Sequence, residues 1–292
     1  MTVVRKRILK IKKKNFTIFI ISALLIIISI IYSINLITKS LTKKEKTNED
    51  KTNEFEIINY YKNENQKRYK LYQKNNPKYS KEKVITDVNI GLDYDYYTND
   101  KPTINLNSKY ILVNKYNYLN KDYVPNNLET ISNQYALKNM QLVNYAKKAF
   151  EEMAKAAKKE NLTIIAMSTY RSYEYQVNLY NNYVKTDGKE KADTYSGRPG
   201  YSEHQTGLAV DIYNGKEPYT NFEITEEFKW MEKNAYKYGF ILRFPKNKTK
   251  ETGYNYESWH YRYVGKEIAE YIQKNKISYE EYYVKYIENK KD

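Results

Sequence analysis

Two histidines occur in the 292 residues, and each has a carboxylate nearby. His204 precedes Asp211 by seven positions in PGYSEHQTGLAVDIYN, and His260 follows Glu257 by three in ESWH. The chain has no cysteine, which excludes disulfides, thiolate metal sites and cysteine nucleophiles. A catalytic zinc ion takes three protein ligands and leaves a fourth position for water. The nitrogen-rich ligand set that this chain can offer is therefore His204, Asp211 and His260.

Each of these residues also has an ordinary structural alternative. A histidine at a strand end is often only a hydrogen-bonding residue, Asp211 could cap a turn, and Glu257 could be a solvated charge at a sheet edge. The metal interpretation is favoured because both histidines of the chain lie in stretches that otherwise have the pattern of packed strands, each with a carboxylate nearby. Glu257 is close enough to reach the open side of such a site without being a ligand, which is where a general base belongs.

Local elements must bring the candidate ligands together. A strand over residues 208–213 (LAVDIY) places Asp211 on one face, beside the small Ala209, and the larger apolar residues on the other. Gly207 can then fold His204 back toward Asp211.

The remaining patterns alternate between helix and strand without a regular strand-helix-strand repeat, which favours an α+β fold. The clearest helix is expected over about 137–159, from its apolar stripe at helical spacing. Other helices are expected in the segments 55–80, about 173–184, about 225–238 (closed by Gly239), 266–276 and 278–291. Strands are expected within 83–99 (with a turn at Gly91), 109–119, 161–172, 240–244 and 256–265. We expect a central antiparallel sheet that carries the zinc site and is flanked by helices.

The N-terminus has the composition of a membrane anchor. Residues 16–37 contain no charge, and at about 1.5 Å per residue a helix of this length spans the hydrocarbon layer of about 30 Å. The run is longer than the apolar region of a cleavable signal peptide, and no A-x-A-like site follows it. A buried core helix is the alternative, but the run is apolar on every side. Seven basic residues precede the span and five follow it, which favours a cytoplasmic N-terminus.

These features divide the chain into five predicted parts. Residues 1–15 form a basic tail, 16–37 a transmembrane helix, 38–54 a charged and flexible stalk, 55–108 an N-terminal extension, and 109–292 the catalytic domain. The protein is thus expected to be a single-pass membrane protein with its catalytic domain outside the cytoplasm. Of the net charge of +15, residues 1–14 carry +7, so that +8 remains on the rest. A basic domain suits a polyanionic neighbour, but no groove-reading motif is present and the span places the domain away from nucleic acid.

Several motifs together resemble the VanY/DacB family of zinc D-alanyl-D-alanine carboxypeptidases. They are S-x-H-x(6)-D in SEHQTGLAVD, E-x-W-H in ESWH, and YRSYEYQ upstream of both. The segment ILVNKYNYLNKDYVP also resembles the one that opens the family's catalytic domain, and VITDVNIGLDYDYYTN resembles the segment before it. The likeness covers roughly residues 60–275. The family shares its fold with lysostaphin-type enzymes and the hedgehog signalling domain.

The resemblance implies roles for individual residues. His204, Asp211 and His260 fall on the ligands of one Zn²⁺ per chain, and Glu257 falls on the catalytic base. Arg171 and Gln176 fall on residues that hold the substrate's carboxylate or scissile carbonyl, which also makes Arg171 a candidate catalytic residue. Ser202 falls on a serine that contacts substrate. The chain departs from the family pattern at Thr169, where glycine is usual, and at Ser258, where proline is usual.

The function implied is that of a membrane-anchored zinc carboxypeptidase that removes C-terminal D-alanine from peptidoglycan stem peptides. The chain is expected to act as a monomer. The alternatives are an endopeptidase on the same scaffold, a wall-binding module without turnover, and a nucleic-acid binder that rests on charge alone. The sequence leaves open whether the bond cut is D,D or L,D.

Overall fold

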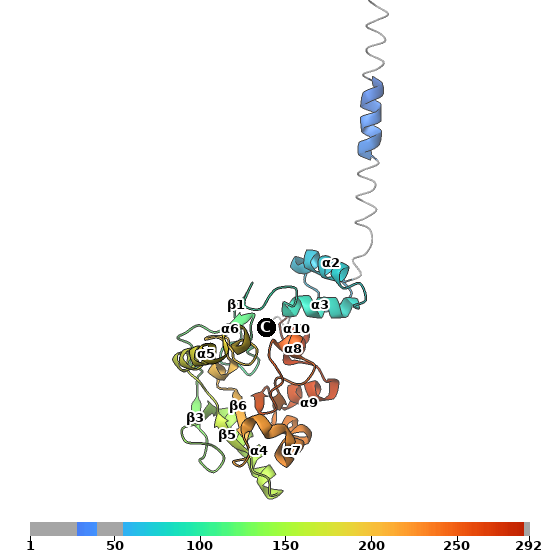
Figure 1. Ribbon diagram of the computed structural model, residues 1–292. Helices are drawn as coiled ribbons and strands as arrows, with labels where there is room; N and C mark the ends of the chain where they lie inside the picture. The colour runs from blue at the N-terminus through green and yellow to red at the C-terminus, as the bar shows by residue number, and fades with distance from the viewer. Residues whose placement is uncertain (1–27, 40–54, 289–292) are drawn as a thin grey trace, which may run out of the picture. The chain divides into compact units, whose positions relative to one another are not determined.

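The computed structural model describes residues 28–39 and 55–288 (Figure 1). Residues 28–39 form a helix. Residues 58–288 belong to one compact unit, which contains the predicted extension from residue 58 onward and the described part of the predicted catalytic domain. Within the described ranges, no helix combines the length and the apolar character needed to cross a bilayer. The predicted tail, residues 16–27 of the predicted span and residues 40–54 of the predicted stalk lie outside the described residues.

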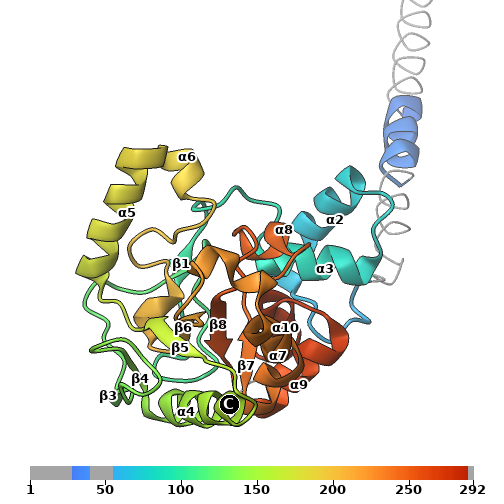
Figure 2. The same ribbon diagram turned by 60° about the horizontal axis from the view of Figure 1, so that its bottom comes forward.

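A four-stranded sheet forms the centre of the compact unit (Figure 2). Its strands are β5 (Ile165–Ser168), β6 (Ala209–Tyr213), β8 (His260–Tyr263) and β7 (Phe240–Leu242), in this spatial order. Every neighbouring pair is antiparallel. The α+β class and the antiparallel sheet expected from the sequence are confirmed.

One face of this sheet packs on α4 (Asn144–Lys159), which lies beneath the strands in Figure 2. The apolar stripe of α4 includes Phe150 and Met153, both fully buried, in one core with Val210 and Tyr261 of the sheet. Burying each side chain of this size contributes about 2 kcal/mol. Because the apolar residues of β6 and β8 turn toward α4, alternation turns Asp211, His260 and Arg262 to the other face.

The helix was expected to begin near residue 137, but it begins at Asn144. Residues before it belong to β4 (Gln141–Val143), which pairs antiparallel with β3 (Leu128–Thr130). This pairing uses backbone groups that a longer helix would need for its own hydrogen bonds, so the helix cannot begin earlier. The apolar spacing of the sequence nevertheless extends N-terminal to the helix start.

Helices flank the other parts of the sheet. The helix α5 (Tyr173–Asp187) begins at Ser172, whose Oγ accepts a hydrogen bond from the Tyr175 amide. The remaining elements of this region are α6 (Lys189–Ala192), η2 (Glu203–Thr206), η3 (Tyr219–Ile224), α7 (Glu226–Asn234), η4 (Ala235–Tyr238), α8 (Thr249–Thr252), α9 (Lys266–Asn275) and α10 (Tyr279–Tyr286). The predicted helices over 173–184, 225–238 and 266–276 are thus present, although a 3-10 turn replaces the end of the second. The helix predicted over 278–291 is present as α10, and its predicted residues 289–291 lie outside the described residues.

The N-terminal extension is helical where a strand was predicted. It comprises η1 (Asn63–Asn65), α2 (Gln66–Asn75) and α3 (Lys81–Ile90), and α3 packs on α10. The prediction of a strand within 83–99 is wrong. Ser80 caps α3 by accepting from the Lys83 amide, and Gly91 ends it with a φ of +107°. These end signals and the burial of one helix face outweigh the β-branched residues within the segment.

The strand predicted over 109–119 is also largely wrong. Only Asn117–Tyr118 (β2) has strand structure there, paired in parallel with β1 (Lys101–Pro102). The apolar residues of this segment are nevertheless buried, because Leu112 enters the core between the sheet, α9 and α10, and Val113 enters the core that contains α4. The segment has the apolar pattern of a strand because its side chains are buried, although most of its backbone pairs with no strand.

Candidate metal centre

The register of the sheet brings two of the predicted ligands together. Asp211 lies directly opposite His260 on β8 and opposite Ser168 on β5. Directly opposite residues of an antiparallel pair have Cβ atoms about 5 Å apart. Strand pairing alone therefore places the carboxylate of Asp211 beside the His260 imidazole, on the face away from α4.

His204 reaches the same place through a tight bend. It lies in η2, which ends at Gly207 with a φ of +67°, in the left-handed region that favours glycine. A Cβ at this position would come within 2.8 Å of Leu128 Cδ2. The bend returns the chain to β6, as the sequence predicted, and His204 lies over Asp211.

The three side chains form a compact and buried cluster. Their candidate ligand atoms all lie within 4.8 Å of one another. Asp211 Oδ2 is 3.3 Å from His204 Nε2, and Asp211 Oδ1 is 2.9 Å from His260 Nδ1. Two imidazoles and one carboxylate are a donor set that suits Zn²⁺ with an open position, so the residues present fit the predicted metal.

The outer nitrogen of each imidazole is fixed by an acceptor. His204 Nδ1 lies 2.7 Å from the carbonyl oxygen of Thr169, which can only accept, so Nδ1 carries the proton and Nε2 presents its lone pair to the cluster. His260 Nε2 lies 2.8 Å from Glu203 Oε1. The Thr169 hydroxyl accepts from the Gln141 amide and leaves the His204 contact undisturbed, which accommodates the departure from glycine.

The two imidazoles of the cluster lie in different electrostatic surroundings. Burial lowers the pKa of His260, but the hydrogen bonds to Asp211 and Glu203 outweigh it and raise this pKa to about 9. Burial opposes ionisation of Asp211, yet His204 and Arg171 hold its pKa well below the usual range. Burial and the nearby Arg171 lower the pKa of His204, so a proton is favoured on His260 and not on His204.

Glu257 stands beside this cluster. Its Oε2 is 3.9 Å from His260 Nδ1, and its side chain is 8% exposed. Burial raises the pKa of Glu257 to about 8, and Asp211 adds to this while His260 opposes it. The residue opens a turn that is closed by the His260 amide on the Glu257 carbonyl. Ser258, in place of the family's usual proline, is buried within that turn.

Arg171 contacts Asp211 through the carboxylate oxygen that does not face His260. Its Nε and Nη2 donate to Ser168 Oγ, and Nη2 also contacts Asp211 Oδ2 at 2.6 Å. The side chain is 18% exposed, so part of it faces solvent. A guanidinium in this place can meet either a substrate carboxylate or a developing oxyanion.

These groups share one cleft of about 400 Å³. Ser168, Arg171, Ser202, His204, Asp211, Glu257 and His260 line it together with a wall of aromatic residues that includes Tyr175, Tyr183, Tyr195, Tyr219 and Trp259. A cleft of this size accommodates a few residues of a peptide. The structure therefore brings six of the seven predicted site residues to one cavity.

Gln176 is the exception. It is buried in α5, where its Nε2 donates to the carbonyl of Gly197 at 2.7 Å and to Ser196 Oγ. It does not line the cleft. Gln176 thus braces the loop that leads to Ser202, and the predicted direct contact with substrate does not follow from its position.

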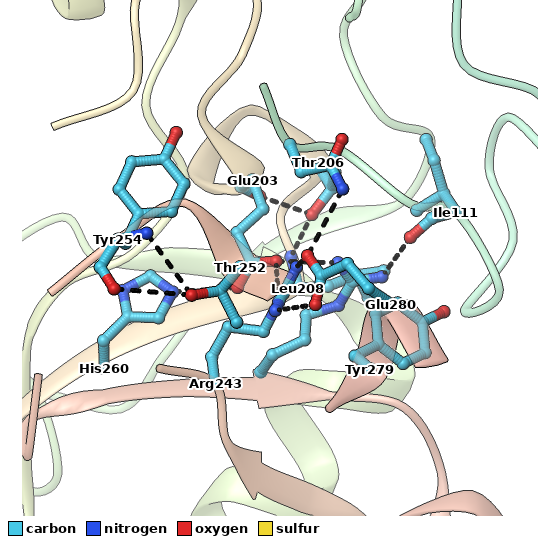
Figure 3. A network of polar contacts seen from close by, with 12 residues as sticks. Ile111, Glu203, Thr206, Leu208, Arg243, Thr252, Tyr254, His260, Tyr279 and Glu280 are labelled. Carbon is cyan, nitrogen blue, oxygen red and sulfur yellow. Dashed lines mark hydrogen bonds and ion pairs between the residues drawn. The ribbon is translucent and has the colours of Figure 1, made fainter. Parts of the chain in front are cut away.

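Sequence reasoning missed a second layer of charged residues. Glu203, Arg243, Arg262 and Glu280 are each at most 4% exposed and form a connected network next to His260. Figure 3 shows Glu203, Arg243 and Glu280 of this network. Glu203 could have been noticed, because it is a carboxylate immediately before a candidate ligand. The other three come from separate elements, and nothing in their spacing points to a shared site.

The extension also contacts the loop that carries the site. Tyr201 donates to Asp100 Oδ2 at 2.6 Å, and the Tyr97 ring lies edge-on to Tyr201. Arg198 lies 3.7 Å over the same Tyr97 ring. Residues predicted only as an extension therefore hold the segment just before Ser202.

Comparison with known proteins decides the family. Residues 139–266 match the family profile described as VanY, D-alanyl-D-alanine carboxypeptidase. The solved LdcB LD-carboxypeptidase is 44% identical, and the match covers 60% of this chain and 85% of that one with a TM-score of 0.56. The chain belongs to the VanY family.

Two further relatives extend the comparison. The VanY D,D-pentapeptidase of a VanB-type resistance cassette, solved as a point mutant in complex with Zn(II), is 34% identical over 60% of this chain and 98% of that chain, with a TM-score of 0.52. The putative carboxypeptidase YodJ of Bacillus subtilis strain 168 is 44% identical over 60% of this chain. The matched part spans 66%, about two thirds, of the length of YodJ.

Proposed function

We propose that this protein is a zinc-dependent carboxypeptidase that removes the terminal D-alanine of peptidoglycan stem peptides. The observation that carries the proposal is the joint placement of three groups in one cleft. They are the His204–Asp211–His260 cluster, the Glu257 carboxylate beside it, and the partly exposed Arg171 guanidinium. Relatives described as carboxypeptidases, one of them solved with Zn(II), support this choice of reaction and metal.

Each residue of the site has its own role in the proposed peptide hydrolysis. When bound, Zn²⁺ polarises a carbonyl and lowers the pKa of water toward 7. Glu257 takes the proton of the attacking water and then gives it to the leaving amine. Arg171 stabilises negative charge on the substrate, either the terminal carboxylate or the developing oxyanion. Thr169 keeps the His204 imidazole in its orientation.

Mass spectrometry of defined stem peptides tests this proposal. Tetrapeptide and pentapeptide stems are incubated with the zinc-loaded protein, with the chelator-treated protein and with Glu257→Gln. We expect loss of one alanine mass with the loaded wild type only. Internal fragments would favour the endopeptidase, and an intact substrate with zinc-loaded protein would favour a binding module. The preferred stem length shows whether the bond is D,D or L,D.

We infer further that residues 16–37 anchor the protein in the cell membrane with its cleft outside. The support is the uncharged span and its more strongly basic N-terminal flank. Fractionation of cells that express the full chain or residues 55–292 tests this. The full chain should sediment with membranes and be digested by external protease in spheroplasts, whereas a full chain found in the soluble fraction would contradict the anchor.

A further inference from the structure

Glu203 links the metal cluster to a buried ionic network. Its Oε1 accepts from His260 Nε2 at 2.8 Å, and its Oε2 accepts from Arg243 Nε at 2.9 Å (Figure 3). The same Oε2 accepts from Arg262 Nη1 at 3.2 Å. The carboxylate thus has one oxygen for the imidazole and one for the guanidinium groups. Glu203 is also the residue before His204, so one short segment supplies a candidate ligand and the support of another.

The network behind Glu203 fixes its position. Arg243 binds Glu280 of α10 through both terminal nitrogens, at 2.9 and 2.6 Å. Arg262 donates to the carbonyl of Ile111 at 2.7 Å. The network holds two carboxylates and two guanidinium groups, so its charges balance. Such a buried set is rigid, because moving any member leaves another charge without its partner.

We propose that Glu203 is a positioning residue that holds the His260 ring so that Nδ1, and not Nε2, faces the metal. The proposal rests on the proposed function, since it assumes that His260 is a zinc ligand. The geometry carries it: Nε2 is directed at a carboxylate that is itself held by two arginines, and Nδ1 is directed at Asp211. Without the carboxylate, the imidazole loses the acceptor that selects its orientation.

A structural role without positioning is the competing explanation, and a matched pair of variants separates the two. Glu203→Gln and Glu280→Gln remove the same charge from the same network, but only Glu203 contacts His260. Zinc affinity is measured by competition with a chromophoric chelator, and folding by circular dichroism. We expect Glu203→Gln to weaken zinc binding about 10- to 100-fold. Glu280→Gln should stay within about threefold of the wild type. Equal losses in both variants would overturn the proposal.

A second variant covers the case in which Glu203→Gln does not fold. Glu203→Asp keeps the charge balance but withdraws the carboxylate from His260 by one methylene. We expect zinc affinity at least about tenfold weaker, because the acceptor no longer reaches the imidazole while the arginines keep an anion. Affinity equal to the wild type would contradict the positioning role.

The wild type alone provides a spectroscopic readout. With two histidines in the whole chain, a ¹⁵N-histidine spectrum contains two rings. In the zinc-loaded protein we expect one ring bound through Nδ1 with a protected Nε2–H, and His260→Gln assigns it. Ligation of that ring through Nε2 would refute the proposal. A wild type that binds no zinc at all would instead refute the proposed function, so the two failures are distinguishable.

Discussion

Replacing Glu257 with glutamine should stabilise the metal-free protein while it abolishes turnover. The wild-type carboxyl has a folded-state pKa of about 8, against an ordinary value of 4.5, with burial as the largest cause. Because the folded-state pKa is raised, the stability that the neutral carboxyl gives the folded protein is fully present below pH 4.5. It is lost as the pH rises through 8. At pH 7 the carboxyl is ionised in the unfolded chain and mostly neutral in the folded protein. This lowers the free energy of unfolding by on the order of 3 kcal/mol, at about 1.4 kcal/mol for each pH unit above 4.5.

Glutamine keeps the shape of the neutral carboxyl and does not titrate. The free energy of unfolding of the variant minus that of the wild type should therefore be near zero at pH 4.5 and rise by about 3 kcal/mol by pH 7. Urea unfolding of both proteins in chelator at several pH values measures this difference, and the exposed Glu190→Gln is the control for the substitution itself. Activity should fall by about 10²–10⁴ with loss of the general base. A difference that does not change with pH, or a variant less stable than wild type at pH 7, would refute the placement of Glu257 in a desolvated site.

Three further predictions follow from the same geometry. Arg171→Lys should raise KM or lower kcat at least about tenfold in the stem-peptide assay, since one ammonium cannot hold Ser168, Asp211 and substrate as the fork does; unchanged kinetics would remove Arg171 from substrate handling. Gly207→Ala should lower the free energy of unfolding by about 1–3 kcal/mol, because it adds a Cβ at a φ of +67° and 2.8 Å from a leucine carbon, which thermal unfolding measures. Asp100→Asn should raise KM a few-fold without changing zinc affinity, because Tyr201 loses its charged acceptor beside the cleft; Asp93→Asn, in the same extension but paired with Arg68, is its control and should leave KM unchanged.

The candidate ligands were predictable because the residues that position them are close in sequence, and because strand periodicity sets the face on which Asp211 and His260 lie. A small residue beside Asp211, a glycine after His204 and a turn before His260 are all local signals. Strand alternation then places Asp211 and His260 on the face away from α4. The register that sets them directly opposite one another is a property of the folded sheet, and the sequence gives no direct sign of it.

The errors arise where tertiary structure decides. The segment 83–99 carries β-branched residues, but the cap at Ser80 and burial against α10 make its first part a helix. Glu203 was passed over because a charged residue in a polar loop is usually solvated, and its partners Arg243 and Glu280 lie far away in sequence. The assignment of Gln176 to substrate rests on motif position and stays a prediction, since its Nε2 donates to the backbone of Gly197.

Zinc-edge anomalous diffraction from crystals of the zinc-loaded protein locates the metal ion itself. We expect one strong anomalous peak per chain between His204, Asp211 and His260, with Glu257 beside it and not bound to it. A peak elsewhere, or no peak at this cluster after incubation with zinc, would refute the proposed metal centre.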